Sequence, residues 1–109
     1  MNIMSKPYKI IYYPTAMDDV RNILNYISID NPPAAYQLID KIDHAVQSLA
    51  DFPSKGTIPK DLQLKTKQYR MLIIESYILF YIPNHTLSEI EIMRFYQASR
   101  IIKVFFDTH

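Results

Sequence analysis

Residues 69–82 read Tyr-Arg-Met-Leu-Ile-Ile-Glu-Ser-Tyr-Ile-Leu-Phe-Tyr-Ile and form the most strongly patterned stretch of the chain. Two short runs rich in aromatic and β-branched residues are separated only by the polar pair Glu75-Ser76. Such runs are typical of β-strands, and so short a link predicts a hairpin. In the second run both pleat faces are apolar. This predicts a strand that is covered on both sides and is therefore central in its sheet.

Arg70 interrupts the apolar character of the first run. A charge in a core strand is costly unless it is paired or reaches solvent at the surface of the sheet. Arg70 is therefore the first candidate for a functional site.

The size and composition of the chain fit one domain spanning residues 1–109. Nearly half of the residues are hydrophobic, and there is no cysteine, so disulfides and thiolate metal sites are excluded. The apolar runs are too short to cross a bilayer, and the N-terminus lacks the apolar segment of a signal peptide. We expect a soluble, cytoplasmic protein that does not act at a membrane.

The charges are unevenly distributed, although the net charge is only +1. Residues 52–74 carry five basic groups and one acidic group, and residues 94–109 carry three basic groups and one acidic group. If these segments meet in space, they form one patch that attracts phosphate. The alternative is a set of ordinary solvated lysines.

The first part of the chain predicts a strand and then two helices. Residues 8–13 read as a strand that Pro14 ends, since proline cannot donate to a β-ladder. Thr15 is expected to cap a helix of about three turns, with Asp18 in a favourable position near its start. The apolar positions of this helix have helical spacing. They are Val20, Ile23, Leu24 and Ile27.

Asn31 is expected to cap a second helix with Pro32 in its first position. The link between the two helices is short, so they should lie antiparallel as a helical hairpin. His44 has no partner at a metal-ligand spacing and is interpreted as structural or exposed. The second helix carries one apolar stripe over four turns. Its members are Ala35, Leu38, Ile39, Ile42, Val46 and Leu49.

Residues 52–68 are predicted to be a loop, with a short strand near residues 62–64. Residues 89–96 alternate as a strand, and a constant period would place Arg94 and Tyr96 on the side of the isoleucines. Residues 99–106 are expected to form a short helix or a docked tail. The predicted order is β-α-α-β-β-β, an α+β fold in which an antiparallel sheet packs against an N-terminal helical hairpin.

The sequence offers little support for metal, phosphate-loop or triad chemistry. The three histidines have no ligand spacing, the single glycine cannot build a phosphate-binding loop, and no serine lies in an elbow motif. If the last three strands are adjacent, basic and phenolic side chains can converge there and bind phosphate. The alternative, favoured by the residues alone, is that the arginines pair with Glu75, Glu89 or Glu91. The tyrosines would then lie at the edge of the core with their hydroxyls in contact with water. The candidate residues are Lys67, Arg70, Tyr81, Arg94, Tyr96, Gln97 and Arg100.

The order and spacing of several segments resemble the RelE/ParE superfamily of type II toxin–antitoxin toxins. The matching segments are residues 8–16, 31–35, 49–56, 69–72 and 77–81, then Met93-Arg94-Phe95 followed by Arg100. The resemblance implies a growth-inhibiting toxin, in some systems serving plasmid stabilisation. It also implies neutralisation by a cognate antitoxin encoded beside it, and it implies no cofactor or metal.

The resemblance also implies two alternative targets. One branch of the superfamily cleaves mRNA on the ribosome, and the ParE-like branch inhibits DNA gyrase. The long helical hairpin is similar to the ParE branch. Many members carry histidine where this chain has Gln97, and glutamine cannot exchange a proton near neutral pH. The gyrase target is our leading hypothesis. The alternatives are a metal-independent endoribonuclease using Arg70, Arg94 and Tyr96 as catalytic residues, and an inactive member that only binds its antitoxin.

Overall fold

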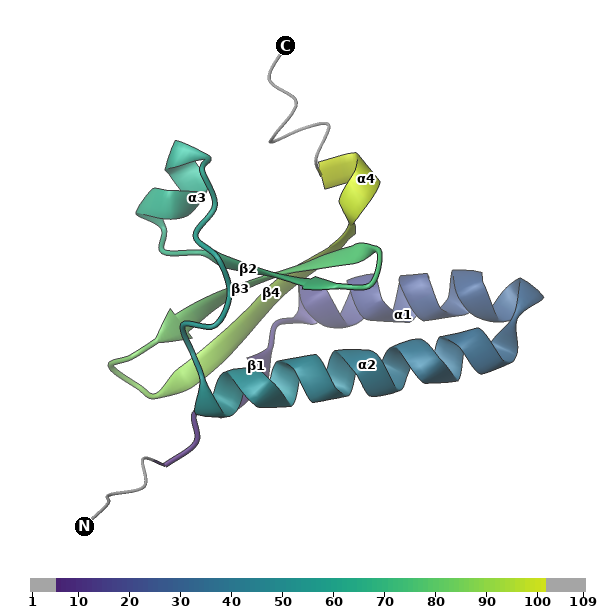
Figure 1. Ribbon diagram of the computed structural model, residues 1–109, viewed down its shortest axis with the longest axis horizontal. Helices are drawn as coiled ribbons and strands as arrows, with labels where there is room; N and C mark the ends of the chain where they lie inside the picture. Colours follow the sequence, from purple (N-terminus) through teal and green to yellow (C-terminus); the bar gives the residue numbers. More distant parts are fainter. Residues whose placement is uncertain (1–5, 102–109) are drawn as a thin grey trace.

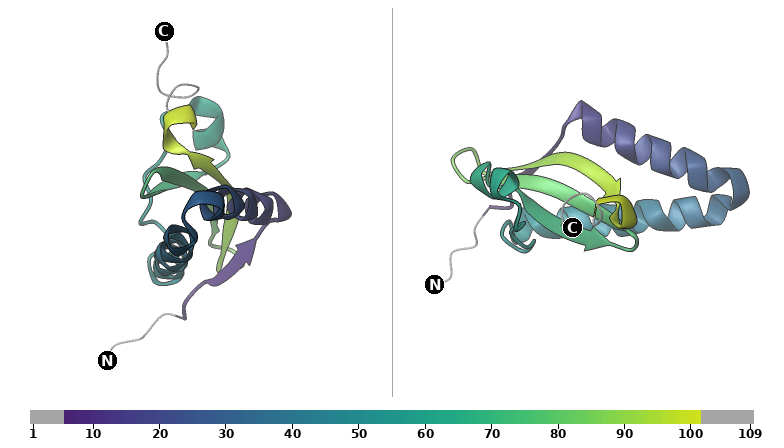
Figure 2. Two further views of the ribbon diagram at one scale, coloured as in Figure 1. Left: turned by 90° about the vertical axis from the view of Figure 1, so that its right-hand side faces the viewer. Right: turned by 90° about the horizontal axis from the view of Figure 1, so that it is seen from above.

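The computed structural model describes residues 6–101, which form a four-stranded sheet with a helical hairpin on one face and two short helices on the other (Figures 1 and 2). This arrangement confirms the predicted α+β class and the predicted hairpin of helices. The elements in chain order are β1 (Lys9–Tyr12), α1 (Pro14–Asp30), α2 (Pro32–Asp51), α3 (Leu62–Thr66), β2 (Arg70–Ile74), β3 (Tyr77–Asn84), β4 (Glu89–Gln97) and α4 (Ala98–Ile101).

The strands lie in the order β1-β4-β3-β2. The predicted hairpin is confirmed as the antiparallel pair β2–β3, and β3 is an interior strand between β2 and β4. The sheet differs from the prediction in one respect, because β1 pairs in parallel with β4 and the sheet is therefore mixed. Alternating side chains show which face of a strand is buried, but they do not indicate the direction of its neighbour.

The core lies between the sheet and the helical hairpin. Asn31 caps α2 as predicted, since its side-chain oxygen accepts a hydrogen bond from the backbone N–H of Ala34 at 3.2 Å. One predicted stripe residue, Ile39, is 41% exposed because it lies at the outer margin of the contact between the helices. The buried residues of this core are Ala16, Leu38, Ile42, Val46, Leu49, Ile74, Leu79, Tyr81, Ile90, Ile92 and Phe95.

Thr15 does not cap α1, and this prediction is wrong. The helix begins at Pro14 with Tyr13 in the capping position, and the Thr15 hydroxyl donates instead to the carbonyl of Met93 at 3.1 Å. β1 pairs with β4 only as far as Ile92, so the outer edge of β4 has no strand partner beyond that point within the described residues. The Thr15 hydroxyl therefore supplies a hydrogen bond to a carbonyl on this edge of β4. A buried carbonyl without a partner would cost free energy of folding. The helix also runs for 17 residues, longer than the predicted three turns.

A β-bulge changes the phase of β4. Tyr81 pairs with Ile92, but its neighbour Phe80 pairs with Arg94, so Met93 is an extra residue on β4. Phe95 therefore faces the helices, where it is 2% exposed, while Arg94 faces the other side of the sheet. The constant period predicted from the sequence is wrong beyond Ile92, because one inserted residue exchanges the two faces of a strand.

Residues 62–64 belong to a helix and not to a strand. The side chain of Asp61 caps α3 by accepting a hydrogen bond from the Leu64 N–H at 3.1 Å. Leu64 packs against the second face of the sheet beside Ile78 and Phe80. Within the predicted C-terminal segment 99–106, the first residues belong to α4, and residues 102–106 lie outside the described part of the chain.

Among residues 6–101, no helix combines the length and the apolar character that spanning a membrane requires.

Candidate functional site

The seven predicted site residues do not converge on one place. The structure distributes them over both faces of the sheet and its far end. Arg70 and Tyr81 lie on the helix-facing side, and Arg94 and Tyr96 lie on the outer face. Gln97 is the last residue of β4, Arg100 lies in α4, and Lys67 lies in the turn after α3.

The register of the strands separates the two arginines predicted to share a phosphate. Arg70 pairs with Tyr81, whereas Arg94 pairs with Phe80, the preceding residue of β3. Successive residues of a strand point to opposite faces, so Arg70 and Arg94 lie on opposite faces of the sheet. The prediction of one pocket containing both guanidinium groups is therefore wrong.

Arg70 and Tyr81 hold a loop against the sheet. Nη1 of Arg70 donates to the carbonyl of Gly56 at 2.7 Å and to that of Ser54 at 3.2 Å. The Tyr81 hydroxyl donates to the carbonyl of Pro53 at 2.8 Å and accepts a hydrogen bond from the Gly56 N–H at 2.9 Å. Tyr81 is fully buried, and this burial raises the pKa of its hydroxyl. Both side chains therefore satisfy backbone groups of the loop.

The single glycine of the chain is required by this packing. A Cβ atom at Gly56 would lie 2.6 Å from the carbonyl oxygen of Met71 and 2.8 Å from the ring of Tyr81. The backbone of Gly56 approaches β2 closely because its neighbour Thr57 forms a two-hydrogen-bond bridge with Met71. Only a residue without a side chain fits at this position.

Arg94 and Tyr96 line a pocket on the outer face of the sheet. The guanidinium carbon of Arg94 lies 4.7 Å from the centre of the Tyr96 ring, within cation–π distance. Phe80 makes edge-to-face contacts with both Tyr69 and Tyr96. We call this cavity of about 280 Å³ the outer-face pocket. Its lining residues are Thr15, Leu64, Tyr69, Phe80, Met93, Arg94 and Tyr96.

Asp19 of α1 holds Arg94 in place. One carboxylate oxygen accepts from Nε of Arg94 at 2.7 Å, and the other accepts from Nη2 at 3.1 Å. The first oxygen also accepts from the backbone N–H of Phe95 at 3.0 Å, on the outer edge of β4. The hydrogen bond to Asp19 raises the pKa of Arg94. Asp19 was not among the predicted site residues, because in the sequence it looks like any polar residue on the exposed face of an amphipathic helix.

The glutamates predicted as alternative partners of the arginines do not fill that role among residues 6–101. Glu75 forms an ion pair with Lys41 at 2.9 Å. Glu91 accepts a hydrogen bond from the side chain of Asn84 at 3.0 Å. The charge on Arg94 is balanced by α1 and not by the sheet.

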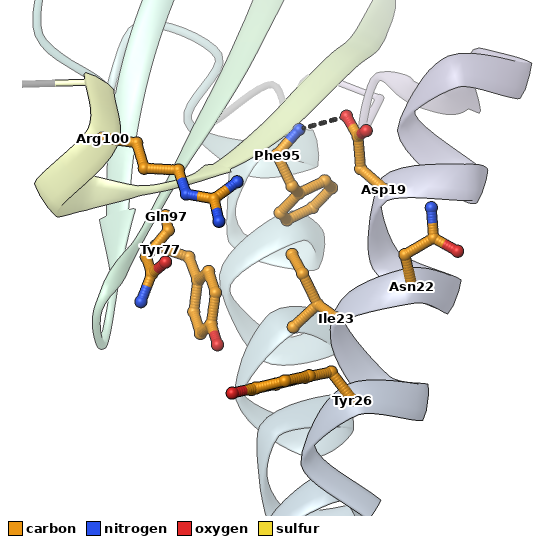
Figure 3. Close-up of a pocket in the computed structure, with 8 residues that line it drawn as sticks. All are labelled: Asp19, Asn22, Ile23, Tyr26, Tyr77, Phe95, Gln97 and Arg100. Atoms are coloured by element: carbon orange, nitrogen blue, oxygen red, sulfur yellow. Dashed lines mark hydrogen bonds between the residues drawn. The ribbon is translucent and has the colours of Figure 1, made fainter.

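Gln97 and Arg100 line a second cavity, which we call the end cavity (Figure 3). It lies between α1 and the ends of β3 and β4, and its volume is about 390 Å³. Figure 3 shows the phenol rings of Tyr26 and Tyr77 beside it, with Ile23 between α1 and the sheet. The lining residues are Asp19, Asn22, Ile23, Tyr26, Tyr77, Phe95, Gln97 and Arg100.

The described part of the chain contains no cluster of three or more histidine, aspartate or glutamate residues that could hold a metal ion. The polar groups of both cavities are mainly guanidinium, amide and phenol groups, together with the carboxylate of Asp19. These groups are suited to hydrogen bonding and aromatic contacts.

Comparison with known families decides the class of the protein. Residues 10–102 match the family model described as the ParE toxin of type II toxin–antitoxin systems, parDE. This protein belongs to the ParE toxin family. The family membership confirms the predicted RelE/ParE superfamily and the preference for its ParE-like branch. No curated protein matches this ParE-family toxin in sequence.

Solved structures with the same fold include members of two toxin–antitoxin systems. A chain of the chromosomal ParDE system from P. aeruginosa superposes with a TM-score of 0.68 at 18% identity, covering 85% of this chain and 98% of that one. A chain of the RelBE2 toxin–antitoxin complex from Mycobacterium tuberculosis superposes with a TM-score of 0.61 at 17% identity, covering 84% and 92%. At these identities the likeness concerns the fold of the ParE-family toxin.

Proposed function

We propose that this ParE-family toxin inhibits growth by binding DNA gyrase, and that an antitoxin encoded beside it neutralises it. The gyrase target follows from the resemblance to the ParE branch. The observation that carries the choice between targets is the separation of Arg70 from Arg94. A ribonuclease of the proposed kind needs guanidinium groups on one phosphate, to stabilise the charge that develops during cleavage.

The remaining residues of the proposed nuclease site also favour a binding inhibitor. Arg70 is committed to two loop carbonyls and Arg94 to Asp19. Gln97 carries an amide that is neither an acid nor a base near neutral pH. It lines the end cavity, apart from the outer-face pocket in which Arg94 and Tyr96 lie.

The antitoxin partner is supported by the structural relatives, one from a ParDE system and one from a RelBE2 toxin–antitoxin complex. The helical hairpin of this chain also presents large apolar side chains to solvent. Tyr26, Ile29 and Tyr36 are each more than 70% exposed at the far end of the hairpin, and Met17 and Ile39 line a groove between its helices. An exposed apolar surface of this kind is suited to a protein partner.

A ribosome-dependent mRNA endoribonuclease is the second candidate. It is favoured by the position of Arg94 above the ring of Tyr96 in an open pocket. In this alternative Arg94 holds the phosphate and Tyr96 assists proton transfer, without a metal. A third possibility is an inactive member that only binds its antitoxin.

Expression of the toxin with and without the antitoxin gene tests these functions. The gyrase proposal predicts loss of plasmid supercoiling or DNA damage while mRNA stays intact, and purified toxin should inhibit purified gyrase. Cleavage of mRNA on translating ribosomes would replace this proposal with the endoribonuclease. Absence of any growth effect, with the antitoxin still bound, would favour the inactive member.

A further inference from the structure

The charge of Arg94 is matched within the protein. Asp19 meets it through two oxygens, at 2.7 and 3.1 Å, and the Asp19 side chain is only 16% exposed. The same carboxylate is fixed by the N–H of Phe95, so it cannot turn away without breaking a backbone hydrogen bond. A geometry in which one planar group faces another through two donors is among the stronger kinds of ion pair.

Among the described residues, the rest of the outer-face pocket carries no charge. Beyond Arg94, its walls are a threonine and apolar or aromatic side chains, and the lysine that follows α3 in sequence, Lys67, does not line it. Burial, followed by the neighbouring Tyr96, raises the pKa of the Tyr69 phenol above its ordinary value, so Tyr69 adds no charge to the pocket. The described walls of the pocket therefore present a net neutral, mainly aromatic surface.

Within residues 6–101, one nitrogen of the Arg94 guanidinium has no acceptor. Nε and Nη2 are used by Asp19, while Nη1 donates to no other described residue. The Arg94 side chain is 40% exposed. A free N–H group beside aromatic walls is suited to a carbonyl or carboxamide oxygen. A phosphate would instead require charge that the protein has not already neutralised.

We propose that the outer-face pocket binds an uncharged anchor side chain of a protein, aromatic or long aliphatic, whose neighbouring carbonyl accepts from Nη1 of Arg94. The proposal rests on the proposed function, because it takes the protein target as the partner. The outer-face pocket has a volume of about 280 Å³, and the anchor side chains of protein interfaces fill well-packed, desolvated pockets. Asp19 is then a positioning residue that orients Arg94 and masks its charge from nucleic acid.

The test measures binding of a fluorescent single-stranded RNA to purified toxin over a series of salt concentrations. The variants are Asp19→Asn and Asp18→Asn, which change the net charge equally. The amide introduced by Asp19→Asn would keep an oxygen for the Phe95 N–H, whereas Asp18 pairs with exposed Arg21 on the surface of α1. We expect Asp19→Asn to bind RNA severalfold more tightly than Asp18→Asn. The slope of log affinity against log salt should be steeper by about 0.7, as for one additional phosphate contact.

A double variant, Asp19→Asn with Arg94→Gln, separates the unmasked arginine from other effects of the substitution. It should bind RNA no better than the natural protein, and thermal unfolding would verify that it is folded. Equal RNA affinity of Asp19→Asn and Asp18→Asn would contradict the inference that Asp19 masks the charge of Arg94 from nucleic acid. Strong, salt-sensitive RNA binding by the natural protein that Arg94→Gln abolishes would overturn the proposal by identifying a phosphate site.

A gyrase supercoiling assay distinguishes failure of this proposal from failure of the proposed function. If the natural toxin inhibits gyrase, Arg94→Gln and the double variant should each raise the half-inhibitory concentration about tenfold, as expected for loss of an anchor contact. Unchanged inhibition in both variants would overturn the protein-anchor pocket. If the natural toxin does not inhibit gyrase at all, the proposed function is wrong, and the RNA measurements still decide whether the pocket is neutral.

Discussion

Arg70 and Arg94 lie on opposite faces of the sheet, because they pair with Tyr81 and Phe80, two successive residues of β3. This relationship assigns different roles to two residues of the same type. Arg70 stabilises the loop that carries Gly56, whereas Arg94 lies in an open pocket with its charge matched by Asp19. Substitutions at the two positions should therefore have different effects.

Substitution of Arg70 by alanine should reduce stability without removing toxicity. The carbonyls of Ser54 and Gly56 would lose a donor, and we expect the free energy of unfolding to fall by about 1–3 kcal/mol. Urea unfolding measures the loss, and growth inhibition is compared at equal levels of soluble toxin. A variant with native stability and no toxicity would contradict the structural role of Arg70.

Substitution of Tyr81 by phenylalanine should be costly although the ring is kept. The Gly56 N–H and the Pro53 carbonyl would lose their common partner, which lowers the free energy of unfolding by about 1–3 kcal/mol. Tyr26→Phe is the matched control, because Tyr26 is 78% exposed, and its effect should be close to zero. A similar loss in the free energy of unfolding in the two variants would show that the hydrogen bonds of the buried Tyr81 hydroxyl do not stabilise the fold.

The stability of the protein should fall at alkaline pH. Burial raises the pKa of Tyr81 above its ordinary value of about 10, so the folded state holds the phenol proton more tightly than the unfolded state. This contribution is complete below about pH 10 and is lost as the pH rises through the pKa of the folded state. Urea unfolding between about pH 8 and about pH 11 should show a steeper decline in the natural protein than in Tyr81→Phe. Parallel curves would argue against this shift in pKa.

Asp19 and Asp18 should differ sharply in their effect on stability. Asp19→Ala leaves the Phe95 N–H and a partly buried guanidinium without an acceptor, and we expect a loss of about 1–3 kcal/mol. Asp18 pairs with Arg21 at the surface, where both side chains are more than half exposed, so Asp18→Ala should cost less than about 1 kcal/mol. Amide hydrogen exchange at Phe95 gives a second measurement. Protection at this amide should fall in Asp19→Ala only.

The candidate site could be predicted only in part from the sequence. The phenol and guanidinium groups were identified by type, and Arg94 and Tyr96 do share a pocket. Their grouping with Arg70 failed because β2 and β4 are separated by β3, whose register determines which face each arginine occupies. Asp19 was missed because its partner is 75 residues away in the chain. Nothing local distinguishes it from Asp18.

The sequence by itself determined the α+β class, the β2–β3 hairpin, the Asn31 cap and the amphipathic helical hairpin. Each depends on residue types within a few positions of one another, so local propensity and periodicity are sufficient. Tertiary structure decided the parallel pairing of β1 with β4, the bulge at Met93 and the ion pair between Asp19 and Arg94. These features arise where distant segments meet. There, the need to satisfy the outer edge of β4 outweighs the local preference of Thr15 to cap a helix.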